Sequence, residues 1–251
     1  MGRRDRVPVW AEPPRIIGRM LASDAVAAAS TWRPQEFGAK RAADVPDPLV
    51  EPLWTGIRLL TFVHDGQVTF TDAYGEPIEG HEDVRAEMRE AAAGTTVLLE
   101  AVLTTEPLQS PIDMAGREQV RTPKASRALG TMVVGDRGDR KDRLAEQVDE
   151  AQRRTIDNQF VPVAIVAVDL LWLDDQSLCD VPLLERRRIL ESVLNESHLV
   201  RVGTFVKPPI DAWLGAWRTF GFRSMAFKGA NSRYIPGSKN PEWGIAQIPR
   251  R

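Results

Sequence analysis

The chain lacks several features that would assign it to a familiar class of protein. Its 251 residues include a single cysteine, Cys179, so no intramolecular disulfide can form. No window approaches the roughly 18 apolar residues of a membrane span. The basic start, residues 1–6, is followed by no apolar stretch of signal-peptide length. We therefore expect a soluble, intracellular protein of the cytoplasm with no membrane partner.

The chain also lacks an excess of positive or negative charge, because the formal net charge is only −2. The chain as a whole thus has no electrostatic signature of nucleic-acid binding, which leaves a local basic patch as the remaining route. The three histidines, His64, His81 and His198, are dispersed, and no His/Cys/Asp spacing indicates a metal site. Cys179 has no histidine near it in sequence, so we expect no catalytic thiol. Gly-rich phosphate loops and nucleophile elbows are absent as well.

Periodic apolar patterns of both kinds are present, and they predict a mixed α and β fold. An Asp-Gly pair at residues 65–66 joins two β-rich runs and predicts a hairpin. Helical spacing is seen at 16–30, 82–93, 182–194 and 210–220, and strand-like runs at 57–63, 67–71, 95–105, 160–173, 199–206 and 222–228. Residues 107–143 are rich in Gly, Pro, Ser and alternating charge, so we expect a flexible surface insertion there, followed by a charged helix near 143–155.

Two clusters invite a functional interpretation, and we favour a structural one for each. The charged run 185–188 resembles a phosphate-binding cluster, but such a run is usually the solvated face of an amphipathic helix. Aromatic and aliphatic residues keep helical spacing near the C-terminus, and we expect them in the core rather than in a base-stacking platform: Ile210, Trp213, Leu214, Trp217 and Phe220.

Four segments together resemble one family. Residues 166–175 (VAVDLLWLDD) and 181–187 (VPLLERR) look like a strand, an acidic turn and a helix of the ATP-dependent DNA ligases, particularly the bacterial repair type. Residues 232–243 (SRYIPGSKNPEW) resemble a later ligase segment, and 50–58 (VEPLWTGIR) resemble the family's first motif. The matches span nearly the whole chain from about residue 47 onward.

The resemblance implies an α+β fold, the ligase nucleotidyltransferase domain, with antiparallel sheets packed with helices. We expect an N-terminal segment at 1–46, with a loose start and a helix, and the ligase-like domain at 47–251 with the flexible insertion at 107–143. Because the sequence given stops just past the last motif, we expect no OB-fold domain.

The same resemblance identifies the position of the nucleophile. In this family a lysine amine attacks the α-phosphate of ATP and holds AMP as a phosphoramidate. Leu53 occupies that position here, and its isobutyl side chain offers no lone pair. Gly56 and Arg58 fit the motif, whereas Thr55 does not.

Other site positions of the family are also changed. Ala73 replaces an arginine that contacts phosphate and ribose, and Val168 replaces an aromatic ring that stacks on adenine. A family glutamate falls at Ala101, or at Glu100 after a shift of one residue. The remaining differences are Arg223 in place of a metal-side glutamate, and Ile245 and Gln247 in place of two lysines.

Four residues are left as candidates for nucleotide or nucleic-acid binding: Glu51, Gly56, Arg58 and Lys228. The competing interpretation is that Arg58 and Lys228 are satisfied by carboxylates and that Glu51 is an ordinary acid at a strand end. The resemblance implies ATP and Mg²⁺ as cofactors, but the substitutions argue against both, so the sequence leaves the cofactor open.

Our leading hypothesis is a ligase-like protein that has lost self-adenylation, a pseudoenzyme or accessory binding protein in DNA repair or recombination. One alternative is an active ligase or nucleotidyltransferase with a split active site or a relocated nucleophile. Lys40 is the lysine nearest the first motif, thirteen residues before Leu53. Another alternative is a structural or regulatory subunit. DNA or a repair protein is the expected partner, and the oligomeric state is left open.

Overall fold

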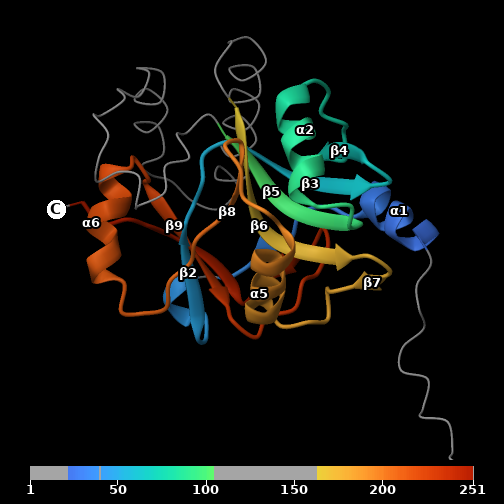
Figure 1. Ribbon diagram of the computed structural model, residues 1–251. Coiled ribbons are helices and arrows are strands. Elements are labelled where there is room, and N and C mark those ends of the chain that lie inside the picture. The colour runs from blue at the N-terminus through green and yellow to red at the C-terminus, as the bar shows by residue number, and fades with distance from the viewer. Residues whose placement is uncertain (1–21, 40, 105–162, 251) are drawn as a thin grey trace, which may run out of the picture.

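The computed structural model describes residues 22–39, 41–104 and 163–250 (Figure 1). In chain order the described elements are α1 Ala22–Thr31, β1 Glu36–Phe37, the 3-10 turn Ala42–Asp44, β2 Pro48–Pro52, β3 Ile57–His64, β4 Gln67–Asp72, α2 Glu82–Ala91, β5 Val97–Thr104, β6 Ala164–Leu173, β7 Gln176–Ser177, α5 Leu183–Val193, β8 Val200–Val202, α6 Asp211–Thr219, β9 Ser224–Gly229, β10 Lys239–Asn240 and β11 Trp243–Gln247. The expected insertion at 107–143, the helix near 143–155 and the loose start lie outside the described residues.

The larger sheet has six strands, in the order β4-β3-β5-β6-β7, with β8 also beside β6. All pairings are antiparallel except that of β6 with β8. The β3–β4 hairpin turns at Asp65 and Gly66, which both have positive φ, as the tight Asp-Gly turn requires. Every residue of β5 is buried, in keeping with its mostly apolar sequence, which Glu100 interrupts and Thr104 ends.

Each face of this sheet is covered. Helices α2 and α5 contribute Val84, Met88 and Leu190 to the core cluster on one face, where they pack on the strands. On the other face, α1 packs its alanines against β3 and β5, together with Tyr234 and Trp243 from the C-terminal part of the chain. Helix α1 and β1 belong to the segment that we expected to precede the domain. Helix α1 packs on the larger sheet, and β1 pairs with β10. The domain boundary at residue 46 stays a prediction.

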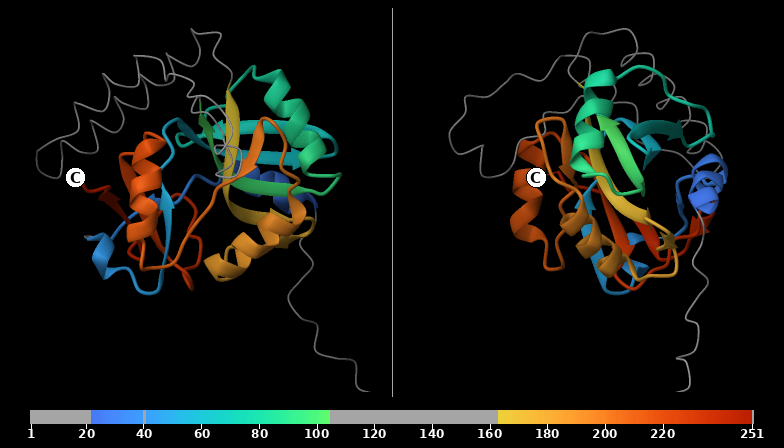
Figure 2. Two further views of the ribbon diagram at one scale, coloured as in Figure 1. Left: turned by 60° about the vertical axis from the view of Figure 1, so that its left-hand side comes forward. Right: turned by 45° about the vertical axis from the view of Figure 1, so that its right-hand side comes forward.

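A second sheet of three antiparallel strands has the order β11-β9-β2. Helix α6 packs on it through Trp217, which meets Val50 and Met225 in a separate core cluster. In the views of Figure 2, α6 lies beside this sheet and away from α2. The loop between β9 and β10 crosses to the larger sheet, where it places Tyr234. The antiparallel sheets packed with helices confirm the expected fold class.

Three local predictions were wrong. The strand expected at 199–206 is only three residues long as β8, and Val206 instead forms an isolated bridge with Val50. Trp213, expected in the core, is 44% exposed because it lies on the outer side of α6. The charged run 185–188 is not a solvated face, since two of its arginines are buried.

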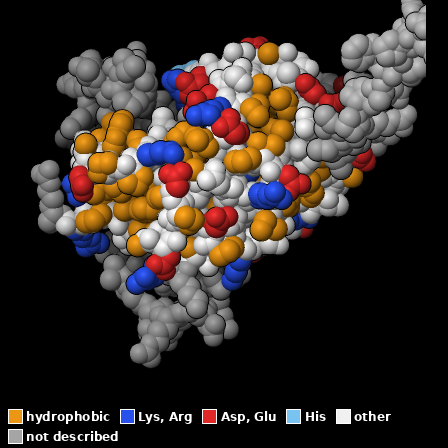
Figure 3. Space-filling view, turned by 90° about the horizontal axis from the view of Figure 1, so that it is seen from below, with side chains coloured by type: hydrophobic (Ala, Val, Ile, Leu, Met, Phe, Trp, Pro, Cys, Tyr) orange, Lys and Arg blue, Asp and Glu red, His pale blue; other side chains and the backbone are white. Residues whose placement is uncertain are grey.

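Within the described residues, no helix is both long enough and apolar enough to cross a membrane. On the face seen from below, lysines and arginines alternate with acidic side chains among apolar ones, which gather toward the α6 side (Figure 3). This face thus carries no broad field of one sign, in agreement with the small net charge.

Candidate functional site

Leu53, which we expect at the position of the family nucleophile, directly follows β2. Its backbone N–H donates to the carbonyl oxygen of Ser224 at 3.0 Å, so the residue is held against the start of β9. Its side chain is half-buried. The next residue, Trp54, packs edge-on against Phe222 with ring centroids 4.9 Å apart. An aliphatic group and an aromatic pair therefore lie at the position where the sequence resemblance predicts the reactive amine.

Gly56 has a structural reason to be glycine. It has φ of +154°, and a Cβ added there would lie 2.1 Å from the backbone oxygen of Leu103 on β5. This close approach lets the chain enter β3 alongside β5. The close packing of Gly56 against β5 is sufficient to explain why a glycine occupies this position, and no bound nucleotide is needed for the explanation.

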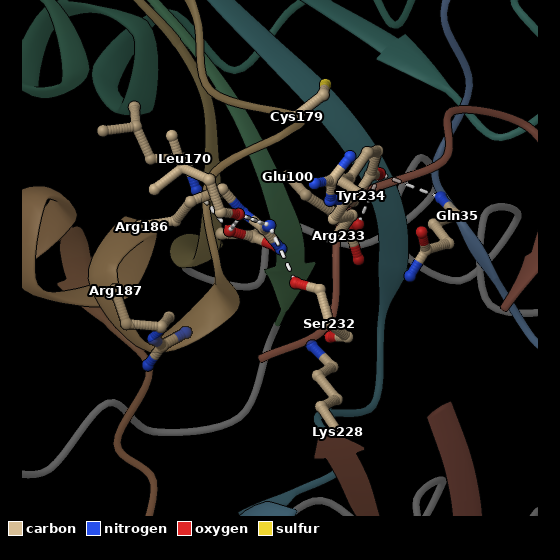
Figure 4. A network of polar contacts seen from close by, with 12 residues as sticks. Gln35, Glu100, Leu170, Cys179, Arg186, Arg187, Lys228, Ser232, Arg233 and Tyr234 are labelled. Atoms are coloured by element: carbon tan, nitrogen blue, oxygen red, sulfur yellow. Dashed lines mark hydrogen bonds and ion pairs between the residues drawn. The ribbon is translucent and has the colours of Figure 1, made fainter. Parts of the chain in front are cut away.

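Arg58 is neutralised inside the protein. Its Nε donates to Oε1 of Glu100 at 2.7 Å, and its guanidinium also donates to the backbone oxygen of Gln35. Tyr234 donates to the other Glu100 oxygen at 2.6 Å and accepts the backbone N–H of Gln35 at 2.8 Å (Figure 4). The residual-charge interpretation of Arg58 is thus the one that its contacts support.

The charges in this group perturb one another. Burial is the largest single influence and lowers the pKa of Arg58, but the attraction to Glu100 and the smaller contributions of other nearby groups together outweigh burial, so the pKa is raised. Burial and then the Glu100 charge raise the pKa of Tyr234 well above its ordinary value. The phenol is accordingly a neutral hydrogen-bond donor. Arg58 and Glu100 thus form an ion pair that is also hydrogen-bonded to Tyr234 and, through the backbone, to Gln35.

Glu100, rather than Ala101, faces Arg58. Ala101 is fully buried in the core on the other face of the sheet. The pairing of β5 with β6 shifts register between Leu98 and Leu99 and again between Glu100 and Ala101. Such bulges displace side chains by one position along a strand. Here the extra residues, Leu171 and Val168, lie on β6, whereas β5 pairs with β3 in unbroken register, so Glu100 and Ala101 keep opposite faces.

Lys228 is the second surviving cation, and it too is paired internally. Its Nζ forms an ion pair with Glu51 and lies 4.4 Å from the ring centroid of Trp243. Lys228 is 3% exposed and Glu51 8% exposed. The other oxygen of Glu51 is 3.7 Å from Nη1 of Arg187. Glu51 is therefore a buried counter-ion shared by two cations.

Arg187 and its neighbour Arg186 are the largest departures from the sequence-based interpretation. Arg186 and Asp169 form a bidentate pair at 2.8 and 2.7 Å, with neither side chain exposed to solvent. Burial is the largest single influence and lowers the pKa of Arg186, but the charge and hydrogen bonds of Asp169, with smaller contributions from nearby groups, together raise it. Arg187 donates to the backbone oxygens of Val168 and Gly203. Both guanidiniums thus anchor α5 to β6 instead of facing solvent.

A signal in the sequence could have revealed this pair. Asp169 interrupts the most apolar run of the chain, and an ionised carboxylate buried in a central strand requires a buried cation. On α5, Leu183, Arg186 and Leu190 share one helical face because their spacing is three and four residues. The partners Gln35 and Tyr234 carried no such signal, because their contacts span about 200 residues or depend on the loop after β9.

The remaining family positions offer no substitute chemistry. Val168 is buried and aliphatic, and Ala73 is half-buried just after β4. Arg223, Ile245 and Gln247 are exposed. Thus the residue expected at the metal-side position is a cation on the surface, and the two residues expected at the positions of triphosphate-binding lysines are neutral.

The described residues do not fit ATP with a bound metal ion. In ranges 22–39, 41–104 and 163–250, no group of three or more His, Cys, Asp and Glu side chains is arranged to hold a metal. Lys228 and Arg58 already have carboxylate partners, and no aromatic ring is available at residue 168. Burial raises the pKa of the Cys179 thiol to about 11, so this group is no ready nucleophile either. Lys40 lies outside the described residues.

Solved structures of ligase domains resemble this fold. The ligase domain of LigD from M. tuberculosis superposes with a TM-score of 0.56 and 19% identity, over 85% of this chain and 58% of that chain. A mycobacterial DNA ligase D complexed with ATP and MES gives a TM-score of 0.57 and 21% identity, over 85% and 59%. At these identities the likeness shows the fold alone.

Curated relatives and a family model give the assignment. A DNA ligase of Thermococcus fumicolans is 28% identical over 137 residues, which cover 51% of this chain and 24% of that protein. A DNA ligase of Methanocorpusculum labreanum is 32% identical over 75 residues, which cover 30% and 14%. The chain thus spans a quarter or less of these relatives. The family model for the ATP dependent DNA ligase domain matches residues 42–244, and the chain belongs to that family.

Proposed function

We propose that this domain is a member of the DNA ligase family that does not adenylate itself and acts instead by binding, as an accessory protein in DNA repair or recombination. One observation carries the proposal: the two cations expected to remain at the site, Arg58 and Lys228, are each paired with a buried carboxylate of the protein itself. The proposal also uses the expectation that Leu53 replaces the nucleophile.

The chemistry explains why these two facts belong together. Transfer of AMP to a lysine needs a free amine in line with the α-phosphate. It also needs cationic groups beside the departing pyrophosphate, which is negatively charged. Leu53 provides no amine. Lys228 is an ammonium held by Glu51, and moving it toward a phosphate would leave a buried carboxylate without its closest partner. Neither requirement is met by the described residues.

The test is incubation with α-labelled ATP and Mg²⁺, followed by acid quenching and detection of amine-linked AMP. Loss of a catalytic nucleophile can reduce the rate on the order of a millionfold, so we expect no label above a heat-denatured control. An intact ligase domain treated in parallel shows that the assay works. A stoichiometric adduct mapped to Lys40 or Lys228 would establish the alternative, an active enzyme with a relocated nucleophile.

A further inference from the structure

Three segments that meet at one end of the three-stranded sheet carry charge of a single sign. Residues 52–57, 212–227 and 243–250 contain three arginines, Arg218, Arg223 and Arg250, and no Asp, Glu or Lys. In a chain with 35 acidic and 33 basic residues, such a stretch departs from the interspersed charges seen elsewhere. We call these three residues the arginine rim.

Two hydrogen bonds bring the rim together in space. Nη1 of Arg218, in the last turn of α6, donates to the backbone oxygen of Pro249 at 2.7 Å, next to Arg250. The backbone oxygen of Arg223 accepts the N–H of Ile248 at 2.9 Å. Figures 1 and 2 show the end of the chain running beside α6. All three arginines therefore belong to one small area of surface.

The rim also adjoins the position of the family nucleophile. Leu53 donates its N–H to Ser224, the residue after Arg223. Trp54, half-buried, follows Leu53 and packs on Phe222, the residue before Arg223. Arg223 therefore places positive charge beside the expected position of the nucleophile and beside the ring of Trp54.

The arginines of the rim differ from Arg188 and Arg233 in their partners, whereas Arg89 on α2 is likewise exposed and bonds only to the backbone oxygen of Gly66. Arg188 is paired with Glu185 at 2.6 Å, and Arg233 with Asp180 at 3.0 Å. Within the part of the chain that the structure describes, Arg223 and Arg250 are exposed and form no ion pair, and Arg218 bonds only to a backbone carbonyl. Unpaired guanidiniums keep their full attraction for an external anion.

We propose that the arginine rim binds the phosphodiester backbone of nucleic acid directly, without a divalent metal ion. This inference rests on the proposed function and assigns a ligand to it. Arginine matches phosphate oxygens with paired N–H donors, and the single-sign surface surrounds the place where this DNA ligase family carries its nucleophile. Trp54 offers one aromatic edge near the phosphates, which suits a strand end or a nick more than an undistorted duplex.

The number of contacts fixes the expected strength. Three phosphate contacts release about three counterions from duplex, which gives a slope of log affinity against log salt near −2.7. Binding is thus easily measured at 50 mM salt and weak at physiological salt. It should persist in EDTA, because no step needs a metal.

The test compares two charge-matched variants by fluorescence anisotropy with a labelled nicked duplex and a labelled single strand. Arg223→Gln with Arg250→Gln removes two rim charges that hold no other part of the protein. Arg188→Gln with Arg233→Gln removes two exposed arginines elsewhere, with the same change in net charge. We expect the rim variant to lose at least about tenfold in affinity at 50 mM salt and about 1.8 of the slope, and the control to bind as the wild type does. Unchanged melting temperatures exclude a folding defect.

Several outcomes would overturn the inference. These are equal loss in both variants, binding that requires Mg²⁺, no binding of either nucleic acid at 50 mM salt, or tighter binding of a polyglutamate probe, which would indicate an acidic protein partner. The adenylation assay decides the proposed function separately, because an AMP adduct would contradict loss of activity without affecting the anisotropy result.

Discussion

Replacing Glu51 by glutamine tests most directly whether this carboxylate neutralises the charges of Lys228 and Arg187. The substitution keeps the size of the side chain and removes the one carboxylate near both Lys228 and Arg187. Both cations are nearly without solvent exposure, so Glu51→Gln leaves two buried positive charges without a counter-ion. Breaking a buried pair in this way costs about 3–5 kcal/mol.

Lys228→Met should cost less, which provides an internal comparison. Glu51 would keep Arg187 at 3.7 Å, and the methionine would still pack on the ring of Trp243. We expect about 1–2 kcal/mol for this variant. The double variant should be more stable than Glu51→Gln alone, because only one of the two cations then remains.

Urea denaturation followed by tryptophan fluorescence and circular dichroism measures these differences. For a domain of this size 1 kcal/mol corresponds to roughly 2–4 °C in melting temperature, so Glu51→Gln should lower it by about 6–20 °C. If Glu51→Gln costs under 1 kcal/mol, or less than Lys228→Met, the carboxylate is not the counter-ion of Lys228. Lys228 would then be available to a phosphate, and the main support for the proposed function would be lost.

Four further outcomes follow from the same geometry. Leu53→Lys should remain without an AMP adduct in the labelled-ATP assay, because the cations beside it are already neutralised; robust adenylation would show an otherwise intact site. Asp169→Asn should destabilise by about 3–5 kcal/mol in urea, since it strands Arg186 in the core, and a cost near zero would contradict the buried pair. Gly56→Ala should cost about 3 kcal/mol or more, because its Cβ meets a backbone oxygen on β5. Cys179, with a thiol pKa of about 11, should react with iodoacetamide at pH 8 much more slowly in the folded than in the urea-unfolded protein.

Local patterns allowed most of the described elements to be predicted. The Asp65-Gly66 hairpin is encoded by its own two residues, since both adopt positive φ. Helix α5 follows Pro182, and α2 ends shortly before Gly94, as their capping residues predicted. The family fold was recognisable because core and turn positions retain their residue types.

Features that depend on contacts between distant segments were missed. The pair of β6 with β8 is parallel and short, and nothing within 199–206 indicates where β8 ends. Arg186 was assigned to the surface because neighbouring charges usually are solvated, whereas its partner Asp169 lies on another element. At the site, the sequence identified which residue types had changed but not that Glu51 had become a counter-ion, because that requires the positions of two side chains on different strands.

The location of positive charge connects the groove with the rim. The pair of half-buried Arg58 and buried Glu100 presents little net field to an approaching polyanion, because its opposite charges lie within hydrogen-bonding distance. The trio of Glu51, Lys228 and Arg187 keeps one positive charge, but that charge is buried and shared with backbone oxygens.

Exposed and unpaired arginines act differently. They attract phosphates over about one Debye length, roughly 8–10 Å at moderate salt. Arg223 and Arg250 are therefore the described cations in this region that an incoming nucleic acid would meet first. The salt dependence of nucleic-acid binding should follow these surface arginines. It should be insensitive to Lys228→Met, because the charge of Lys228 is already matched by Glu51 inside the protein.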